Sequence, residues 1–331
     1  MVKSLKQRGS LLMAALVLVV GVSQVASYGT ASAAAKKGNA NSIKVSPLRT
    51  DITVKPGTTG TVAVYVTNVS SGAVTLKPIE NDFVAGDEKG TPAIILDQNS
   101  YAPTHSLKRF MLPLKNISLN ANQTKKVNLK IKVPITAQAG GYFGALRFAP
   151  ASTGSKPVSL NASVASLVLM TVPGPTAEKL ALTNFDVQQD GNTAGNFRTP
   201  KDLILLVRFK NEGNKQEAPF GQVQVLKGKK VLYSYNFNQT DPKDEVLPDS
   251  ARRWEVPLKN LGKFGKYTVS GTFGYGNGQT VQVSKTIWII PTSYIIGAIV
   301  IVVGLILLIL LIRFFLKSYK RRILRSYHRP Y

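Results

Sequence analysis

A run of uncharged residues near the C-terminus constrains this chain more than any other feature. Tyr294 to Ile312 holds 19 residues without a charge. As a helix this run would be about 28 Å long, which matches the hydrocarbon core of a bilayer. Trp288 and Tyr294 stand at its start, where aromatic rings prefer the membrane interface. We therefore expect one transmembrane helix over residues 294–312.

The tail behind this run indicates its orientation. Residues 313–331 carry seven Lys and Arg and no acidic residue. Basic segments beside a span stay on the cytoplasmic side. Such a tail could in principle bind nucleic acid, but its place directly after a span favours anchoring. We expect a basic cytoplasmic tail over 313–331 and no nucleic-acid partner.

The N-terminus has the layout of a secretory signal peptide. Lys3, Lys6 and Arg8 precede the apolar stretch 11–22, and Ala-Ser-Ala at 31–33 forms a small-residue cleavage site. The alternative, a retained membrane anchor, fits the short apolar run less well. We expect a signal peptide over 1–33 and a polar linker over 34–41. The protein would then be a single-pass cell-membrane protein with its N-terminal domains outside the cell.

Composition argues against catalysis and against bound cofactors. The 42 Lys and Arg outnumber 17 Asp and Glu, for a net charge of +25. The absence of cysteine excludes disulfides, thiolate metal sites and a cysteine nucleophile, and two histidines exclude a histidine-rich metal site. A catalytic triad would need His105, which we expect in a loop. The sequence has no Walker loop, zinc motif or Gly-x-Ser-x-Gly elbow, so we expect no enzyme, no metal and no cofactor.

The region between the two ends breaks into short β-type runs separated by Gly, Pro, Asn and Ser. Val62, Val64 and Val66 alternate with polar positions, which predicts a strand with one buried face. The other predicted strands are 43–45, 51–54, 74–79, 93–96, 109–114, 125–133, 142–148, 163–172, 180–187, 203–209, 222–226, 231–237, 252–258, 267–275 and 280–290. No long helical period occurs before the span, so the region is predicted to be all-β.

Turn signals divide these strands into two domains. Pro-Gly-Pro at 173–175 separates residues 42–173 from residues 176–290, and each half has about the strand number of an immunoglobulin-like β-sandwich. Glycine-containing turns at 227–229 and 276–278 would close two hairpins. The halves also share a strand that ends in an asparagine, Asn68 and Asn211. The predicted fold is two tandem sandwiches followed by one C-terminal transmembrane helix.

One predicted strand presents a row of lysines. Within 125–133 the apolar residues point one way, while Lys126, Lys130 and Lys132 point the other way, with Lys125 beside them. This face could bind an anionic wall polymer or lipid headgroups. Alternatively, the lysines only keep an exposed sheet face soluble.

A second surface candidate lies at Gly140 and Gly141. A glycine pair in a strand indicates a bulge or a close backbone approach. Tyr142 and Phe143 follow directly and could stack on a sugar or on a protein partner. Alternatively, both aromatic rings belong to the core.

Several of these motifs together resemble the first domain of the WxL-interacting proteins, a family of Gram-positive cell-surface proteins. They are Pro-Leu-Arg at 47–49, Val-Lys-Pro-Gly at 54–57, the strands 62–68 and 126–133, and the run 140–148. The resemblance covers roughly residues 43–150 by motif and the rest by layout. It implies a peptidoglycan-binding first domain and partner proteins with a Trp-x-Leu motif. Residues 247–254 and 265–267 depart from the family's usual second domain, so the host-protein binding described for that domain is left open for this chain.

We therefore expect a membrane-anchored surface protein whose outer sandwich binds cell-wall polymer, either peptidoglycan or a teichoic-type glycan, or a surface protein partner. The candidate binding residues are Lys126, Lys130, Lys132, Tyr142 and Phe143. An assembly factor similar to pilus chaperones is the alternative, because those chaperones also begin with an immunoglobulin-like domain. A wall-active enzyme is a third possibility that lacks a catalytic constellation.

Overall fold

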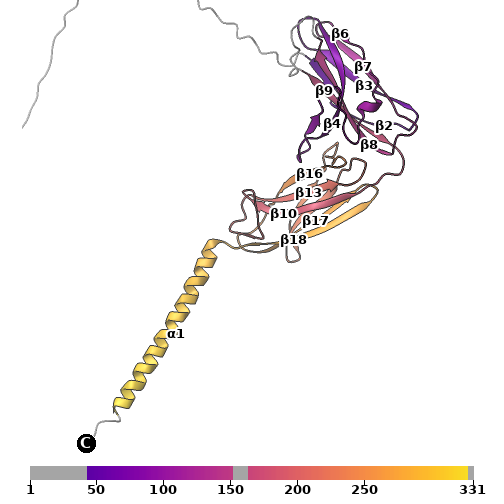
Figure 1. The fold of residues 1–331 in the computed structure, drawn as a ribbon. Coiled ribbons are helices and arrows are strands. Elements are labelled where there is room, and N and C mark those ends of the chain that lie inside the picture. The colour runs from indigo at the N-terminus through magenta and orange to yellow at the C-terminus, as the bar shows by residue number, and fades with distance from the viewer. Residues whose placement is uncertain (1–42, 152–162, 327–331) are drawn as a thin grey trace, which may run out of the picture. The chain divides into compact units, whose positions relative to one another are not determined.

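The computed structural model describes residues 43–151 and 163–326. The predicted signal peptide, the linker and the last five residues of the tail lie outside the described residues. Over the described ranges the chain forms eighteen strands, one short 3-10 helix and one long C-terminal helix (Figure 1). The predicted fold class, all-β with two immunoglobulin-like sandwiches and one apolar C-terminal helix, is confirmed.

The first sandwich consists of a three-stranded sheet and a larger sheet. The small sheet has the order β1 (Ile43–Ser46), β3 (Thr59–Asn68) and β7 (Thr124–Lys132). The larger sheet has the order β2 (Arg49–Thr53), β9 (Val164–Val172), β8 (Gly140–Pro150), β4 (Val74–Ala85) and β5 (Pro92–Ile94), with β6 (Ile117–Leu119) also paired to β4.

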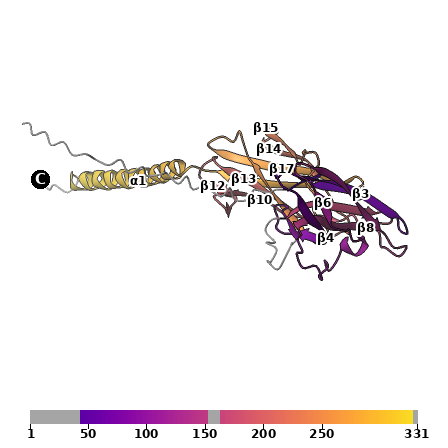
Figure 2. The same cartoon turned by 90° about the horizontal axis from the view of Figure 1, so that it is seen from above.

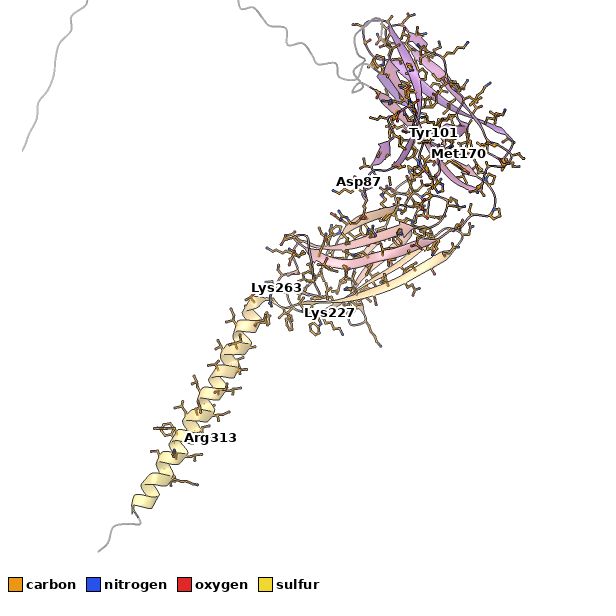
Figure 3. All side chains as sticks on the ribbon, in the orientation of Figure 1. Asp87, Tyr101, Met170, Lys227, Lys263 and Arg313 are labelled. Carbon is orange, nitrogen blue, oxygen red and sulfur yellow. The ribbon has the colours of Figure 1, made fainter. Side chains whose placement is uncertain are left out.

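Alternation along the strands builds the core of this sandwich. Val62, Val64 and Val66 of β3 are at most 1% exposed, and they belong to the same apolar cluster as Phe148 of β8 and Met170 of β9. Figure 3 shows Met170 within the first sandwich. Side chains at every second strand position point to one face, so the apolar positions of both sheets meet in one layer.

The second sandwich also has two sheets. The smaller has the order β11 (Asn192–Thr193), β10 (Leu180–Gln189), β13 (Leu203–Asn211) and β16 (Ala251–Pro257). The larger has the order β12 (Asn196–Phe197), β18 (Gln279–Ile289), β17 (Gly265–Tyr275), β14 (Phe220–Lys227) and β15 (Lys230–Phe237). Figure 2 labels β12, β14, β15 and β17 of this sheet. Three phenylalanines, Phe209, Phe237 and Phe273, are fully buried between the sheets, with ring centroids 5.0–6.4 Å apart.

Both predicted hairpins of this sandwich are present. β14 and β15 pair antiparallel across Gly228, whose φ is +61°, and β17 and β18 pair across Gly276 and Gly278. Positive φ at these positions favours glycine, because it has no Cβ to clash with the backbone.

The asparagine repeat is a structural repeat. Asn68 accepts a hydrogen bond from the Ser70 backbone N–H and donates to the Gly72 carbonyl. Asn211 accepts from the Gly213 N–H and donates to the Lys215 carbonyl. Both side chains are fully buried, so each asparagine holds the turn behind its strand from inside.

The prediction of a strand over 109–114 was wrong. Lys108–Phe110 form a 3-10 helix instead. The buried Asp82 carboxylate accepts hydrogen bonds from the Lys108 N–H at 2.8 Å and the Ser106 hydroxyl at 2.6 Å. These bonds hold the segment as a turn, and its only strand-like contacts among the described residues are those of residues 111 and 112 with β7.

The C-terminal helix α1 (Thr292–Ser326) starts before the predicted span and ends after it. Among the described residues, one helix is long and apolar enough to cross a membrane, namely Thr292–Lys320. The chain has no glycine or proline between Gly304 and Ser326, so nothing interrupts the helix at Ile312, where the basic tail begins.

Candidate functional site

The lysine row lies on β7 as the alternation predicts. Lys126, Lys130 and Lys132 are exposed, while Val127, Leu129, Ile131 and Val133 are buried. β7 is one of the two outer strands of the three-stranded sheet. On one strand, next-but-one side chains are about 7 Å apart, so the amines of Lys130 and Lys132 form a short row.

The neighbouring strands extend this row into a basic face. The cross-strand partners of the three lysines on β3 are Thr59, Thr61 and Tyr65. Tyr65 is 45% exposed, and Lys44 lies exposed on β1. None of the three strands contains Asp or Glu. The outer side of this sheet, which we call the lysine face, therefore carries amines, hydroxyls and one aromatic ring without an internal counter-charge.

Tyr142 lies in a cleft of about 450 Å³ that is lined by the first sandwich and by Asn214 of the second. Its ring packs against Phe110, with 5.0 Å between centroids, and its hydroxyl donates to the Gln138 carbonyl at 2.9 Å. Burial raises the pKa of Tyr142. Arg109 also lines the cleft, but its guanidinium lies over the ring of Tyr101, 4.6 Å from the centroid.

Phe143 is placed differently from the expectation for a ligand-stacking ring. It is 3% exposed and packs against Phe83, with 5.9 Å between the ring centroids. Tyr142 and Phe143 point to opposite faces of β8, and Phe143 is buried because a second apolar cluster with Phe83 and Leu169 covers its face. A buried ring cannot stack on a ligand, so Phe143 leaves the set of candidate binding residues.

His105 lies in a loop, as expected from the sequence. Its Nδ1 donates to the Gly141 carbonyl at 2.7 Å, and its Nε2 lies 3.9 Å from an Asp249 carboxylate oxygen. The ring thus holds the loop against β8. Within the described residues, no group of three or more His, Asp and Glu side chains is arranged to hold a metal ion.

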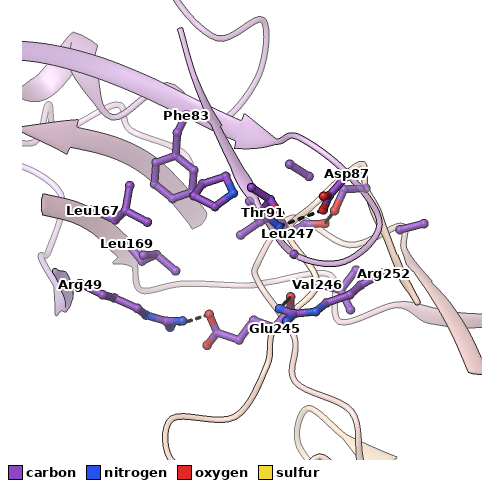
Figure 4. A pocket seen from close by; sticks show the side chains of 15 residues that line it. Arg49, Phe83, Asp87, Thr91, Leu167, Leu169, Glu245, Val246, Leu247 and Arg252 are labelled. Atoms are coloured by element: carbon purple, nitrogen blue, oxygen red, sulfur yellow. Dashed lines mark hydrogen bonds and ion pairs between the residues drawn. The ribbon is translucent and has the colours of Figure 1, made fainter. Parts of the chain in front are cut away.

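Residues of the two sandwiches meet around a small cavity of about 90 Å³ (Figure 4). Arg49 donates to the Glu245 carboxylate at 2.6 Å and to Asp51 at 2.8 Å. Burial raises the pKa of Glu245, and the Arg49 charge opposes that shift. Leu247 packs against the apolar cluster around Phe83. The cavity has room for a few water molecules but not for a saccharide or a peptide.

A second ion pair connects β13 with the loop after β4. Arg208 binds the Glu88 carboxylate through three hydrogen bonds of 2.6–3.0 Å. This contact lowers the pKa of Glu88 and raises that of Arg208. The Arg253 backbone N–H also donates to the Glu88 carbonyl at 2.7 Å, which occupies part of the outer edge of β16.

β15 is an outer strand of a different kind. It pairs with β14 on one side, and no strand of the described residues pairs with its other side, where Asn260 donates to the Leu232 carbonyl. Its sequence from Val231 to Phe237 carries no charge, and Val231 is 46% exposed. Alternation in the sequence predicted this strand. Its place at the edge depends on the strand order, which the sequence does not encode locally.

Comparisons with known proteins leave the family open. No family model matches the chain, and no curated protein matches it. The resemblance to the WxL-interacting proteins therefore stays a prediction.

Several solved structures are similar to this chain. One is the class 5 fimbriae chaperone CfaA, at 12% identity over 73% of this chain and 98% of that one, with a TM-score of 0.38. Another is the E. coli chaperone DraB, at 16% identity over 75% and 96%, with a TM-score of 0.30. A third is the complex of the chaperone CsuC with the tip subunit CsuE of Acinetobacter baumannii Csu pili, at 11% identity over 73% and 97%, with a TM-score of 0.33. What this protein binds is argued from its own residues.

Proposed function

We propose that this protein is a non-catalytic, membrane-tethered surface assembly factor that holds a strand of another surface protein at the free edge of β15. The apolar helix α1 would anchor it, with both sandwiches outside the cell and the basic end of the helix inside. The observation that carries the proposal is the difference between β15 and the other outer strands.

The other outer strands are protected against pairing with a foreign strand. β7 carries four lysines, and its Lys130 carbonyl accepts a hydrogen bond from the Leu112 N–H at 2.9 Å. β16 has two arginines and a glutamate, and Glu88 occupies part of its edge. The remaining outer strands have two to five residues. Short length, lysines and covered edges are the usual means of blocking edge-to-edge pairing.

β15 has only a lysine at its first residue, Lys230, and one covered carbonyl, that of Leu232, which accepts from Asn260; the rest of the strand lacks these protections. Tyr233, Tyr235 and Val231 give it strong strand propensity, and no proline or charge interrupts it. An incoming strand would gain backbone hydrogen bonds along the edge, each contributing about 0.5–1.5 kcal/mol. A surface protein with an unpaired strand is therefore the partner that this edge fits.

Photo-crosslinking in the producing cells tests the proposal. A photoreactive residue in place of Ser234 on β15 should give a crosslink to another surface protein, and the same residue in place of Asn128 on β7 should not. Adding lysines at two exposed positions of the edge, Val231→Lys with Ser234→Lys, should abolish partner capture, and Asn128→Lys serves as the matched control. Crosslinks from β15 only to a second copy of the chain, or equal crosslinks from both strands, would contradict the proposal.

A second candidate function rests on the lysine face. Four amines on one sheet side without an acidic residue suit an anionic wall polymer. Single exposed contacts contribute about 0.2–1 kcal/mol and are screened by salt, so several must act together. The full-length protein in detergent should sediment with purified wall at low salt, and removal of teichoic-type polymer should reduce this binding. The triple variant Lys126→Gln, Lys130→Gln, Lys132→Gln should lose the binding to wall. If neither added salt nor this variant changes the binding, the lysines serve only to keep the face soluble.

A further inference from the structure

The outer side of the larger sheet in the second sandwich is polar but uncharged. In this sheet the even-numbered residues of β14 and β17 point away from the core, and they include Gln222, Gln224, Ser270 and Thr272. This side is hollowed into a groove of about 730 Å³. None of the fourteen lining residues is charged, although 18% of the whole chain is.

The groove contains a ladder of side-chain amides. The Gln224 amide donates to the Gln222 carbonyl oxygen at 2.8 Å, and the Gln222 amide donates to Asn236 at 3.5 Å. Gln222 also stands opposite Thr272 in the register of β14 and β17. Each amide carries both donors and acceptors, and each hydroxyl can act as either. The ladder thus presents mixed hydrogen-bonding groups in a row across three strands.

An aromatic ring borders this ladder. Phe220 is 43% exposed, and a Cβ built on Gly274 would lie 3.3 Å from its ring, so the absence of a side chain at Gly274 lets the ring lie close to the sheet. Lys243 is the cation beside it, with Nζ 5.5 Å from the ring centroid. Sites that bind small polar ligands combine such apolar rings with a few placed amides and hydroxyls.

From this arrangement we propose that the groove binds a neutral saccharide. Its hydroxyls match the amide and hydroxyl ladder, and its C–H face matches the Phe220 ring. An anionic polymer would find no counter-charge among the lining residues. A protein strand would find no free backbone, because β14 is paired on both sides, with β15 and with β17. This proposal is independent of the function proposed for the β15 edge and for the lysine face.

Titration calorimetry of the full-length protein in detergent tests the inference with uncharged oligosaccharides of glucose, mannose, galactose or N-acetylglucosamine as probes. At least one probe should bind, and raising NaCl from about 0.05 to about 0.5 M should leave its affinity unchanged, because no ion pair is involved. The double variant Gln222→Ala, Gln224→Ala should weaken binding about tenfold through lost hydrogen bonds. Phe220→Ala should weaken it separately, which covers the case that the double variant does not fold.

Two control variants should bind like the wild type. Gln98→Ala removes an exposed glutamine from the other sandwich, and Lys126→Gln tests the lysine face. No binding by any probe at millimolar concentration, binding lost at high salt, or equal loss in Gln98→Ala would overturn the inference. Circular dichroism and the melting temperature confirm that each variant is folded.

Discussion

Arg208 and Glu88 join the two sandwiches through a forked ion pair, in which both nitrogens of the guanidinium edge, Nε and Nη2, bind one carboxylate. Both side chains are partly exposed, with 31% of the Arg208 surface and 42% of the Glu88 surface accessible. An ion pair at this exposure contributes about 0.2–1 kcal/mol, because water screens it.

Glu88→Gln should therefore reduce stability slightly and in a pH-dependent way. The pKa of Glu88 is lowered in the folded protein by Arg208. The stabilisation that the Glu88 carboxylate contributes is present above the unfolded-state pKa, and it is lost as the pH falls through the lowered folded-state pKa. Thermal unfolding from neutral to acidic pH should show the variant converging with the wild type. Glu255→Gln, whose carboxylate lies 3.6 Å from Arg253, is the matched control and should cost less.

Glu217 should show the opposite pH dependence. Its side chain is 5% exposed, and burial raises its pKa, an effect that Lys215 and the Gly276 N–H oppose. A raised folded-state pKa means that the folded state binds the proton more tightly, so stability falls as the pH rises from the unfolded-state pKa through the folded-state one. Glu217→Gln removes this slope. Between the unfolded-state and folded-state pKa of Glu217, the stability of the variant should rise relative to the wild type in the same unfolding series. If the stabilities of the two proteins change in parallel with pH, the pKa of Glu217 is not raised by folding.

The two equivalent asparagines predict matched losses of stability. Asn68→Ala and Asn211→Ala each remove a fully buried amide that makes several hydrogen bonds and leave backbone groups without partners. Each should cost about 1–3 kcal/mol. Urea unfolding measures this loss, with the exposed Asn128→Ala as a control within about 0.5 kcal/mol of the wild type. A negligible effect at Asn211 alone would mean that the two turns are not equivalent in energy.

Division of the chain at residues 173–175 should give two folded fragments. Each sandwich has its own apolar cluster, and neither cluster contains a residue of the other sandwich. Recombinant 42–173 and 176–290 should each show strand-type circular dichroism and a cooperative melt. Fragments that are unfolded when separate but fold on mixing would show that contacts such as Leu247 with the Phe83 cluster are essential.

Protease protection tests the orientation of the proposed anchor. Added to cells stripped of wall, protease should digest both sandwiches and leave a small membrane-protected fragment that contains α1. The reason is the excess of Lys and Arg after Ile312. If the two sandwiches survive and only the basic tail is digested, the orientation is the reverse of the predicted one.

The sequence predicts the strands well, because alternating valines and glycine turns are local signals. The strand with Val62, Val64 and Val66 and the turn at Gly228 could be predicted without knowledge of the rest of the fold. The segment 109–114 was mispredicted because its conformation depends on the distant carboxylate of Asp82. The alternation of side chains along β8 predicts that Tyr142 and Phe143 point to opposite faces of the strand. It does not predict that Phe143 is buried, because that depends on the residues of other strands that pack over its face. The amide ladder and the free edge of β15 arise from strand order, to which no local pattern points.

The connection between the second sandwich and α1 has a mechanical consequence. β18 ends at Ile289 and α1 begins at Thr292, so Ile290 and Pro291 are all that join them. A force that pulls on the helix is therefore transmitted directly into β18, which is registered antiparallel with β17 over eleven residue pairs. A pull along the strand loads these backbone bonds in parallel, as a shear, and does not open them one after another. If α1 is the anchor, the second sandwich is built to resist tension between the cell and whatever the protein holds.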